Sequence, residues 1–155
     1  MRLLDRTGWI ADPFVRDGDR PTLVPFAQAE SAIAQGDPIG IEIANTTDAG
    51  ALDPWLGRVD LIAILFPQHR DGRGFSLARQ LRERGFAGRL RATGALIPDQ
   101  FGFALACGFD EVEIDETRAG RQPVEQWLAA LAAIDLAYQD SAARPSIFEL
   151  RRRAA

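Results

Sequence analysis

The residues best suited to chemistry gather in one polar loop, residues 68–76, which reads QHRDGRGFS. Its two glycines would let the backbone come close to an anion, and a helix beginning here would add free N–H groups and the positive end of its dipole. Arg70 and Arg73 could clamp a phosphate, sulfate or carboxylate through paired N–H groups. The loop therefore indicates an anion site. The alternative is an ordinary turn from strand to helix, in which Asp71 caps the helix or binds an arginine.

The same loop does not match the dinucleotide-binding pattern, because Gly72 and Gly74 are not followed by the third glycine that the pattern requires. His69 is the only residue of the loop that titrates near neutral pH, so it is the default acid–base candidate. The alternative is a loop histidine without a catalytic role. A second polar segment, residues 98–100, opens another predicted helix and reads Pro-Asp-Gln.

Some chemistry is excluded by composition. All 18 basic residues are arginine, so Schiff-base chemistry, a lysine base and the lysine of a phosphate-binding loop are absent. His69 and Cys107 are the only soft metal ligands, and no metal site is expected. We expect Cys107 to be a small buried apolar residue.

The elements that must position these residues alternate between strands and helices. The apolar pattern predicts strands at 38–44, 60–66, 89–93 and 111–114 and helices at 75–84 and 98–108. Short links between them predict a parallel sheet with right-handed crossovers, whose ligands bind at the carboxyl ends of the strands. The expected fold is a single α/β domain with a parallel sheet of four or more strands. An open flavodoxin-like sheet and a half-barrel-like sheet are both compatible with it.

The chain divides around this core, residues 38–138. Residues 1–36 are expected to form a brace or lid that contains a small hairpin and a short helix. The core ends with a helix from Pro123 to Tyr138, and residues 139–155 form a tail that ends in arginines.

Charged residues interrupt three of the predicted strands. Glu42, Arg91 and Glu113 would lie on one face of the sheet if their strands were neighbours. Because an unpaired buried charge is costly, we expect them to pair or to face water. An ion-paired flank under thin helix cover is one interpretation. The other is a polar wall that reaches toward the strand-end site.

Composition limits the class of protein. With 155 residues, 46% of them hydrophobic, the chain can bury a sizeable core. A net charge of −4 argues against nucleic-acid and membrane-surface partners, and no apolar run is long enough to span a bilayer. One cysteine and no signal peptide favour a cytoplasmic protein.

The candidate ligand-binding residues are Arg70, Asp71, Gly72, Arg73, Gly74, Ser76, Asp99, Gln100, Arg91 and Glu42. The cofactor, the substrate and the choice between a monomer and a homo-oligomer are left open.

The motif FPQHRDGRGFSLARQLRERGFAG, followed by LRATG, Asp99-Gln100 and CGFD, resembles a bacterial family called domain of unknown function 934. The resemblance covers nearly the whole chain. Gln68, Ala95 and Ala106 depart from it, standing where the family usually has lysine, aspartate and arginine. The family is typically encoded beside the haemoprotein subunit of assimilatory sulfite reductase and is often labelled oxidoreductase. The resemblance implies a role in sulfite reduction or sulfur assimilation, without an established reaction.

Two functions are compatible with these features. The first is an accessory protein that docks on the sulfite reductase haemoprotein subunit or its electron donor, with Phe103 and Phe148 as contact candidates. The second is a small α/β enzyme or an oxyanion- or phosphate-binding protein at the carboxyl edge. The residues around its sulfur oxyanion or phosphate would be Arg73, Asp71, Asp99 and Arg91.

Overall fold

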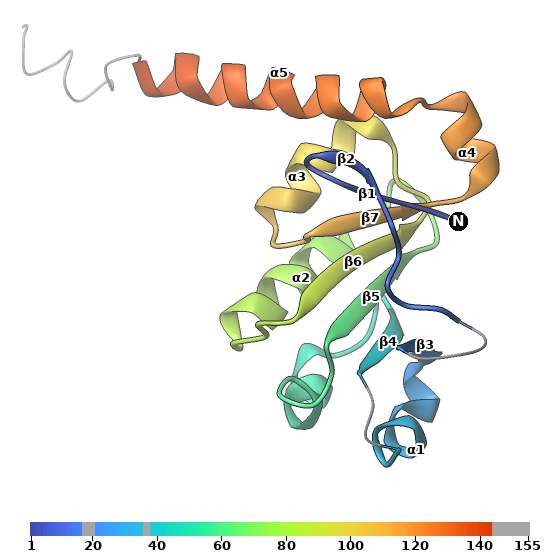
Figure 1. Ribbon diagram of the computed structural model, residues 1–155. Helices are drawn as coiled ribbons and strands as arrows, with labels where there is room; N and C mark the ends of the chain where they lie inside the picture. Colours follow the sequence, from blue (N-terminus) through green and yellow to red (C-terminus); the bar gives the residue numbers. More distant parts are fainter. Residues whose placement is uncertain (17–20, 36–37, 144–155) are drawn as a thin grey trace, which may run out of the picture.

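A seven-stranded sheet with the order β2-β1-β7-β6-β5-β4-β3 organises the molecule (Figure 1). The computed structural model describes the backbone of residues 1–16, 21–35 and 38–143, and the side chains of these residues up to 133. Strands β3 to β7 are parallel, and the β1–β2 hairpin joins β7 antiparallel. The predicted α/β domain with a mostly parallel sheet and an N-terminal hairpin is confirmed.

The strands are β1 Arg2–Asp5, β2 Gly8–Ile10, β3 Thr22–Pro25, β4 Ile39–Ala44, β5 Leu61–Phe66, β6 Arg89–Gly94 and β7 Glu111–Ile114. The α-helices are α1 Ala29–Ile33, α2 Arg73–Glu83, α3 Phe101–Ala106, α4 Glu116–Arg121 and α5 Val124–Ala143. Three 3₁₀ segments are η1 Phe26–Gln28, η2 Ala49–Trp55 and η3 Pro98–Gln100.

The parallel strands follow one another in the order of the chain. Right-handed crossovers between sequential neighbours place every connecting helix on the same face of the sheet. That face carries the main core, in which Ile41, Ile64, Ala92 and Val112 are fully buried under the helices. Since the order contains no reversal, it corresponds to the half-barrel-like arrangement and not to the flavodoxin-like one.

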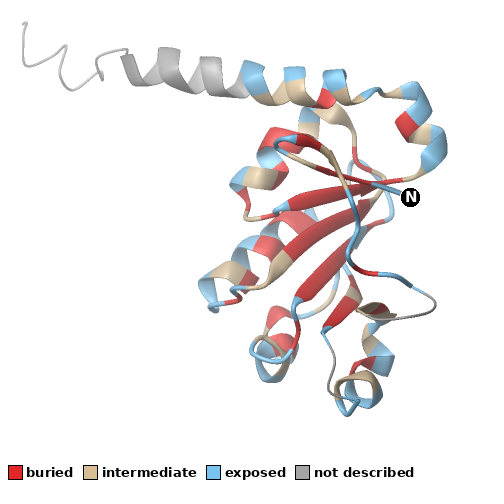
Figure 2. Ribbon diagram, viewed as in Figure 1, coloured by how far each residue is buried: buried red, intermediate tan, exposed pale blue. Residues whose placement is uncertain are grey.

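The N-terminal residues are part of the sheet and do not merely brace it. The hairpin β1–β2 extends one edge, and β3 forms the other edge beside β4. Between them, residues 11–16 cross the face opposite the helices, and we call this segment the strap (Figure 1). Phe14 of the strap packs on Leu23, Leu61 and Ala63 in a second, smaller core. The central strands are therefore buried on both faces (Figure 2).

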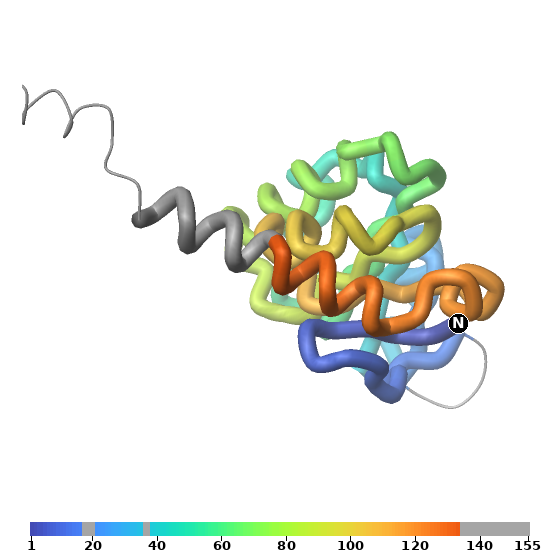
Figure 3. The backbone as a smooth tube through the Cα atoms, turned by 90° about the horizontal axis from the view of Figure 1, so that it is seen from above, coloured from blue at the N-terminus to red at the C-terminus, as the bar shows by residue number. Residues whose placement is uncertain are grey.

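Helix α5 closes the end of the helix layer. Its Trp127 is fully buried and meets Phe101 edge-on, with 5.8 Å between ring centroids. The helix contacts α3, η3 and β2, and Figure 3 shows it running past the N-terminal hairpin. The predicted helix at 123–138 is confirmed and continues to Ala143.

Residues 144–155, with Phe148 and the terminal arginines, lie outside the described residues. Within the described residues, no helix has the length and apolar character to cross a membrane.

Candidate functional site

The loops after the parallel strands meet at one edge of the sheet, which we call the rim: residues 45–48, 67–72, 94–100 and 115–117. β5 and β6 are parallel neighbours, so the loops carrying Asp71 and Asp99 leave the sheet side by side. A hydrogen bond of 2.6 Å from Gln100 Nε2 to the carbonyl of His69 joins them. The predicted juxtaposition of the two polar loops is confirmed.

The arginine of the first loop has a partner within its own turn. Arg73 donates to the carboxylate of Asp71 through Nε at 2.8 Å and Nη2 at 2.5 Å, and its backbone N–H adds a third contact at 3.3 Å. Asp71 thus lies at the start of α2, where an anion would otherwise bind. This arrangement matches the alternative interpretation in its second form, a turn in which Asp71 binds an arginine. The N-cap position of α2 is Gly72, and no side chain caps it. Arg70, Gly72 and Ser76 are exposed beside it.

The electrostatics of this pair give a direct test. The hydrogen bonds from Arg73 hold the pKa of the Asp71 carboxyl well below its usual range, and the amide of buried Asn45 lowers it further. Because the pKa of Asp71 is lower in the folded than in the unfolded chain, its pair with Arg73 stabilises the fold fully at pH values above the unfolded pKa. This stabilisation is lost only as the pH falls through the folded pKa. We therefore expect the Asp71 side-chain carbon to show no NMR titration between about pH 6 and pH 3, where an ordinary aspartate with a pKa of about 3.9 titrates.

Arg73→Gln is the control for this titration, because it removes the dominant partner and keeps the turn. The Asp71 resonance should then titrate near the ordinary value. Wild-type titration at that value would contradict the described pair.

The second glycine of the loop has a packing role. A Cβ on Gly74 would lie 2.4 Å from Cζ of Phe66, whose ring packs against Phe75 and Phe109. Gly74 therefore lets α2 approach β5 closely. Gly72, by contrast, has an ordinary φ of −78°, and a Cβ there would make only an ordinary contact, 4.0 Å from Cδ2 of Phe75. Neither the backbone nor packing therefore requires glycine at this position.

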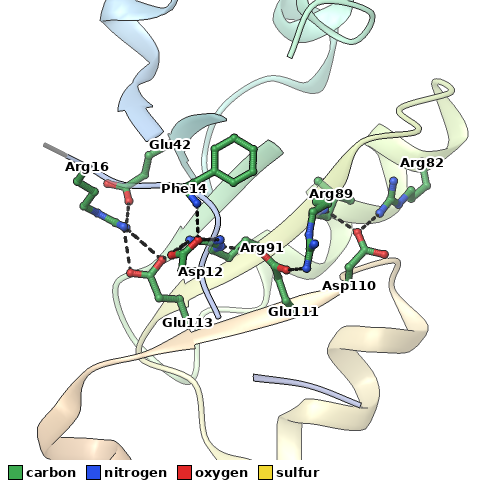
Figure 4. A network of polar contacts seen from close by, with 11 residues as sticks. Asp12, Phe14, Arg16, Glu42, Arg82, Arg89, Arg91, Asp110, Glu111 and Glu113 are labelled. Carbon is green, nitrogen blue, oxygen red and sulfur yellow. Dashed lines mark hydrogen bonds and ion pairs between the residues drawn. The ribbon is translucent and has the colours of Figure 1, made fainter. Parts of the chain in front are cut away.

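Arg91 and Glu42 do not join the other candidates at the rim. They lie on the strap face of the sheet, on either side of Ala63 in the central strand β5 (Figure 4). Arg91 is fully buried, and its guanidinium contacts three carboxylates, those of Asp12, Glu111 and Glu113. A ligand would have to displace one of these to reach it.

The strap completes this network of charges. Asp12 accepts two hydrogen bonds from Arg91, at 2.6 and 2.7 Å. Arg16 bridges the sheet, with Nη2 2.6 Å from Glu42 and Nη1 3.0 Å from Glu113. Burial alone would lower the pKa of Arg91, but its hydrogen bonds to Asp12 and Glu111 raise the pKa above the ordinary value. The ion-paired interpretation of this face is confirmed. The face was expected to lie under thin helix cover, and it is covered by the strap.

A further arginine of the sequence motif joins two helix ends. Arg82 of α2 donates to the carbonyls of Phe86, Gly88 and Gly108, at 2.7 to 2.9 Å, and to the carboxylate of Asp110. A Cβ on Gly108 would lie 2.7 Å from the Arg82 side chain. These motif residues therefore hold the chain turns after α2 and α3 together.

A groove lies between α2 and α3 in the helix layer. It measures about 530 Å³ and is lined by Phe75, Arg79, Phe103 and Cys107, among others. Phe103 is 53% exposed and stacks edge-on against Phe75, with 5.0 Å between centroids. Cys107 is buried as expected, and burial raises the pKa of its thiol despite the neighbouring Arg79.

A second hollow lies at the rim itself. It measures about 200 Å³ and is lined by His69, Ala95, Leu96, Ile97, Arg118, Arg121 and Gln122. Sequence reasoning placed His69 near this edge but missed both arginines. The available signal was Asp115, an N-cap residue that accepts from the backbone N–H of Arg118 and starts α4.

The raised pKa of Cys107 disfavours the thiolate that a nucleophile needs. Within the ranges that the structure describes, no three His, Cys, Asp or Glu side chains gather in a way that could hold a metal ion.

A family profile with the description "Bacterial protein of unknown function (DUF934)" matches residues 40–148. No curated protein matches the chain. The matched span includes the rim, the α2–α3 groove and the core strands, and it leaves out the hairpin and the strap.

Proposed function

The chain belongs to the bacterial family of unknown function DUF934, and from this premise we propose that it is an accessory protein of assimilatory sulfite reduction that docks on its partner through the α2–α3 groove. The partner is the haemoprotein subunit of sulfite reductase or its electron donor. The link to sulfite reduction comes from the gene neighbourhood that the sequence resemblance implies. The docking role is supported by the groove.

The observation that carries the docking role is the exposed ring of Phe103. Large aromatic side chains that are exposed and held in place by a neighbour are typical anchors of protein interfaces. Phe103 is held edge-on by Phe75, so little side-chain freedom remains to be lost on binding.

The charges beside the groove suggest what the partner presents. Three other arginines of this region already have carboxylate partners: Arg73 with Asp71, Arg82 with Asp110 and Arg84 with Asp53. Arg79 lines the groove and contacts the Cys107 thiol, and it has no carboxylate partner in the described part of the chain. The fitting partner surface carries an apolar side chain for the groove and a carboxylate for Arg79.

A catalytic site at the carboxyl edge receives less support. Asp71 and Arg73 satisfy each other, and Arg91 is enclosed by its own carboxylates. Anion binding, one part of that alternative, has support at a different set of residues, those that line the hollow at the rim.

Replacing Phe103 with serine tests the docking role. We expect the dissociation constant for the purified haemoprotein subunit or the electron donor to rise at least tenfold, a loss of about 1.4 kcal/mol. Because about half of Phe103 is exposed already, stability should change little. Isothermal titration calorimetry of each pair gives the constants.

Val15→Ser is the matched control. Val15 is also an exposed apolar residue, 40% exposed, but it lies on the strap, away from the groove. It should bind like the wild type. Equal affinities of wild type and Phe103→Ser, or no binding of either partner by the wild type, would refute the proposal.

A further inference from the structure

The hollow at the rim is lined by cationic and neutral groups alone. Arg118 and Arg121 come from α4, His69 comes from the loop after β5, and the remaining lining residues are apolar or amide. We propose that this pocket binds a small oxyanion, either an inorganic one or the phosphate or carboxylate group of a small metabolite. This site is independent of the docking groove and contains none of the arginines predicted from the sequence.

The fold positions the first arginine firmly. The carboxylate of Asp115 caps α4 at the backbone N–H of Arg118 and lies 3.2 Å from its Nε. Arg118 Nη1 donates to the carbonyl of Gly94 at 3.0 Å, which ties α4 to the end of β6. The guanidinium is thereby fixed at the pocket wall, and Nη2 makes no hydrogen bond within the described residues. A preorganised guanidinium loses little freedom when it binds an oxyanion.

The second arginine supplies the charge that is not balanced. Arg121 follows Arg118 by three residues, so the two side chains share one face of α4. Arg121 is exposed and makes no ion pair in the part of the chain that the structure describes. The carboxylate of Asp115 balances the charge of Arg118 but not that of Arg121. The pocket is therefore left with a net positive charge, which an anion would neutralise.

Size and position fit the same class of ligand. At about 200 Å³, the hollow is smaller than the roughly 300–1,000 Å³ typical of drug-sized ligands, and it suits a compact anion. It lies at the carboxyl ends of parallel strands, where ligands of such sheets bind. Gln122 contributes an amide whose Oε1 is buried and has no partner among the described groups. A singly protonated oxyanion would bring the O–H that this oxygen can accept.

The test is titration of the purified chain with sulfate, sulfite and phosphate, using sodium chloride of matched ionic strength as the blank. Glycerol phosphate and acetate form a second arm that separates inorganic from organic oxyanions. We expect saturable binding of at least one of these anions and a rise in Tm above the chloride blank. Arg121→Gln should weaken that binding at least tenfold. Arg84→Gln, which removes the same charge from an arginine paired with Asp53, should change it less than twofold.

Two outcomes would overturn the proposal. One is a wild-type chain that shows no saturable binding of any anion beyond the chloride blank. The other is binding that is lost in Arg73→Gln but kept in Arg121→Gln, because the site would then be the loop of residues 68–76. Circular dichroism of each variant confirms that it is folded. Neither outcome affects the docking proposal, which depends on Phe103.

Discussion

Replacing Arg91 with methionine lowers the free energy of unfolding by about 3–5 kcal/mol, the usual cost of removing one member of a buried ionic cluster. The guanidinium is fully buried, and it contacts the carboxylates of Asp12, Glu111 and Glu113 at 2.6 to 3.1 Å. Methionine fills a similar volume but leaves these carboxylates without their shared cation. Glu111 and Glu113 are themselves almost fully buried, so water cannot replace the lost contacts without opening the strap.

Urea unfolding of Arg91→Met beside Arg84→Met measures this effect. Arg84 pairs with Asp53 on the surface, where both side chains are about half exposed. A surface pair of this kind contributes about 0–1 kcal/mol, so the control should lose no more than that. If both variants lose the same small amount, the network on the strap face does not carry the energy assigned to it.

Gly94→Ala is the second change for which we expect a large loss of stability, about 2–5 kcal/mol. Gly94 ends β6 with a φ of +100°, a region in which an L-residue costs about 1–2 kcal/mol. A Cβ at this position would also lie 2.5 Å from the backbone oxygen of Phe66. Because that oxygen belongs to the neighbouring strand, relief requires β5 and β6 to shift, which adds about 1–3 kcal/mol.

Gly85→Ala separates the two contributions. Gly85 follows α2 with a φ of +90°, close to that of Gly94, but a Cβ there meets no atom within 4 Å. The control should therefore lose only the conformational part, about 1–2 kcal/mol. Thermal unfolding of the two variants gives the difference. Equal losses would show that β5 and β6 do not pack as closely as described.

The core of the fold could be predicted from the sequence because its signals are local. The continuous apolar run of β5 and the alternation in β4, β6 and β7 identify the parallel strands, and the helix boundaries agree within a few residues. The two edges of the sheet could not be assigned in the same way. β2 and β3 are short, and their place is fixed by pairing with strands that are distant in the sequence.

In the candidate sites, too, local features could be predicted and long-range contacts could not. The spacing of Glu42, Arg91 and Glu113 predicted a shared face, but it did not reveal their partners on the strap. Arg91 reaches Asp12 across 79 positions, and Arg16 reaches Glu113 across 97. Such pairs depend on the path of the chain and leave no local pattern.

The polar loop was located correctly and its glycines were partly misinterpreted. Residues 68–76 do lie at the rim, but Gly74 is required by the ring of Phe66 and not by the approach of an anion. The cationic pocket beside the loop is completed by α4, whose arginines come more than 40 positions later in the chain. The pocket forms because the chain returns past the carboxyl end of β6. The hydrogen bond from Arg118 to Gly94 holds α4 there.

Hydrogen–deuterium exchange of the chain with and without its partner tests the docking account most directly. In the complex with the sulfite reductase haemoprotein subunit or the electron donor, amide exchange should slow in peptides that cover α2 and α3, residues 73–83 and 101–106. Peptides that cover the strap should exchange at an unchanged rate. Protection confined to the strap or the hairpin, with α2 and α3 unaffected, would contradict the proposed docking surface.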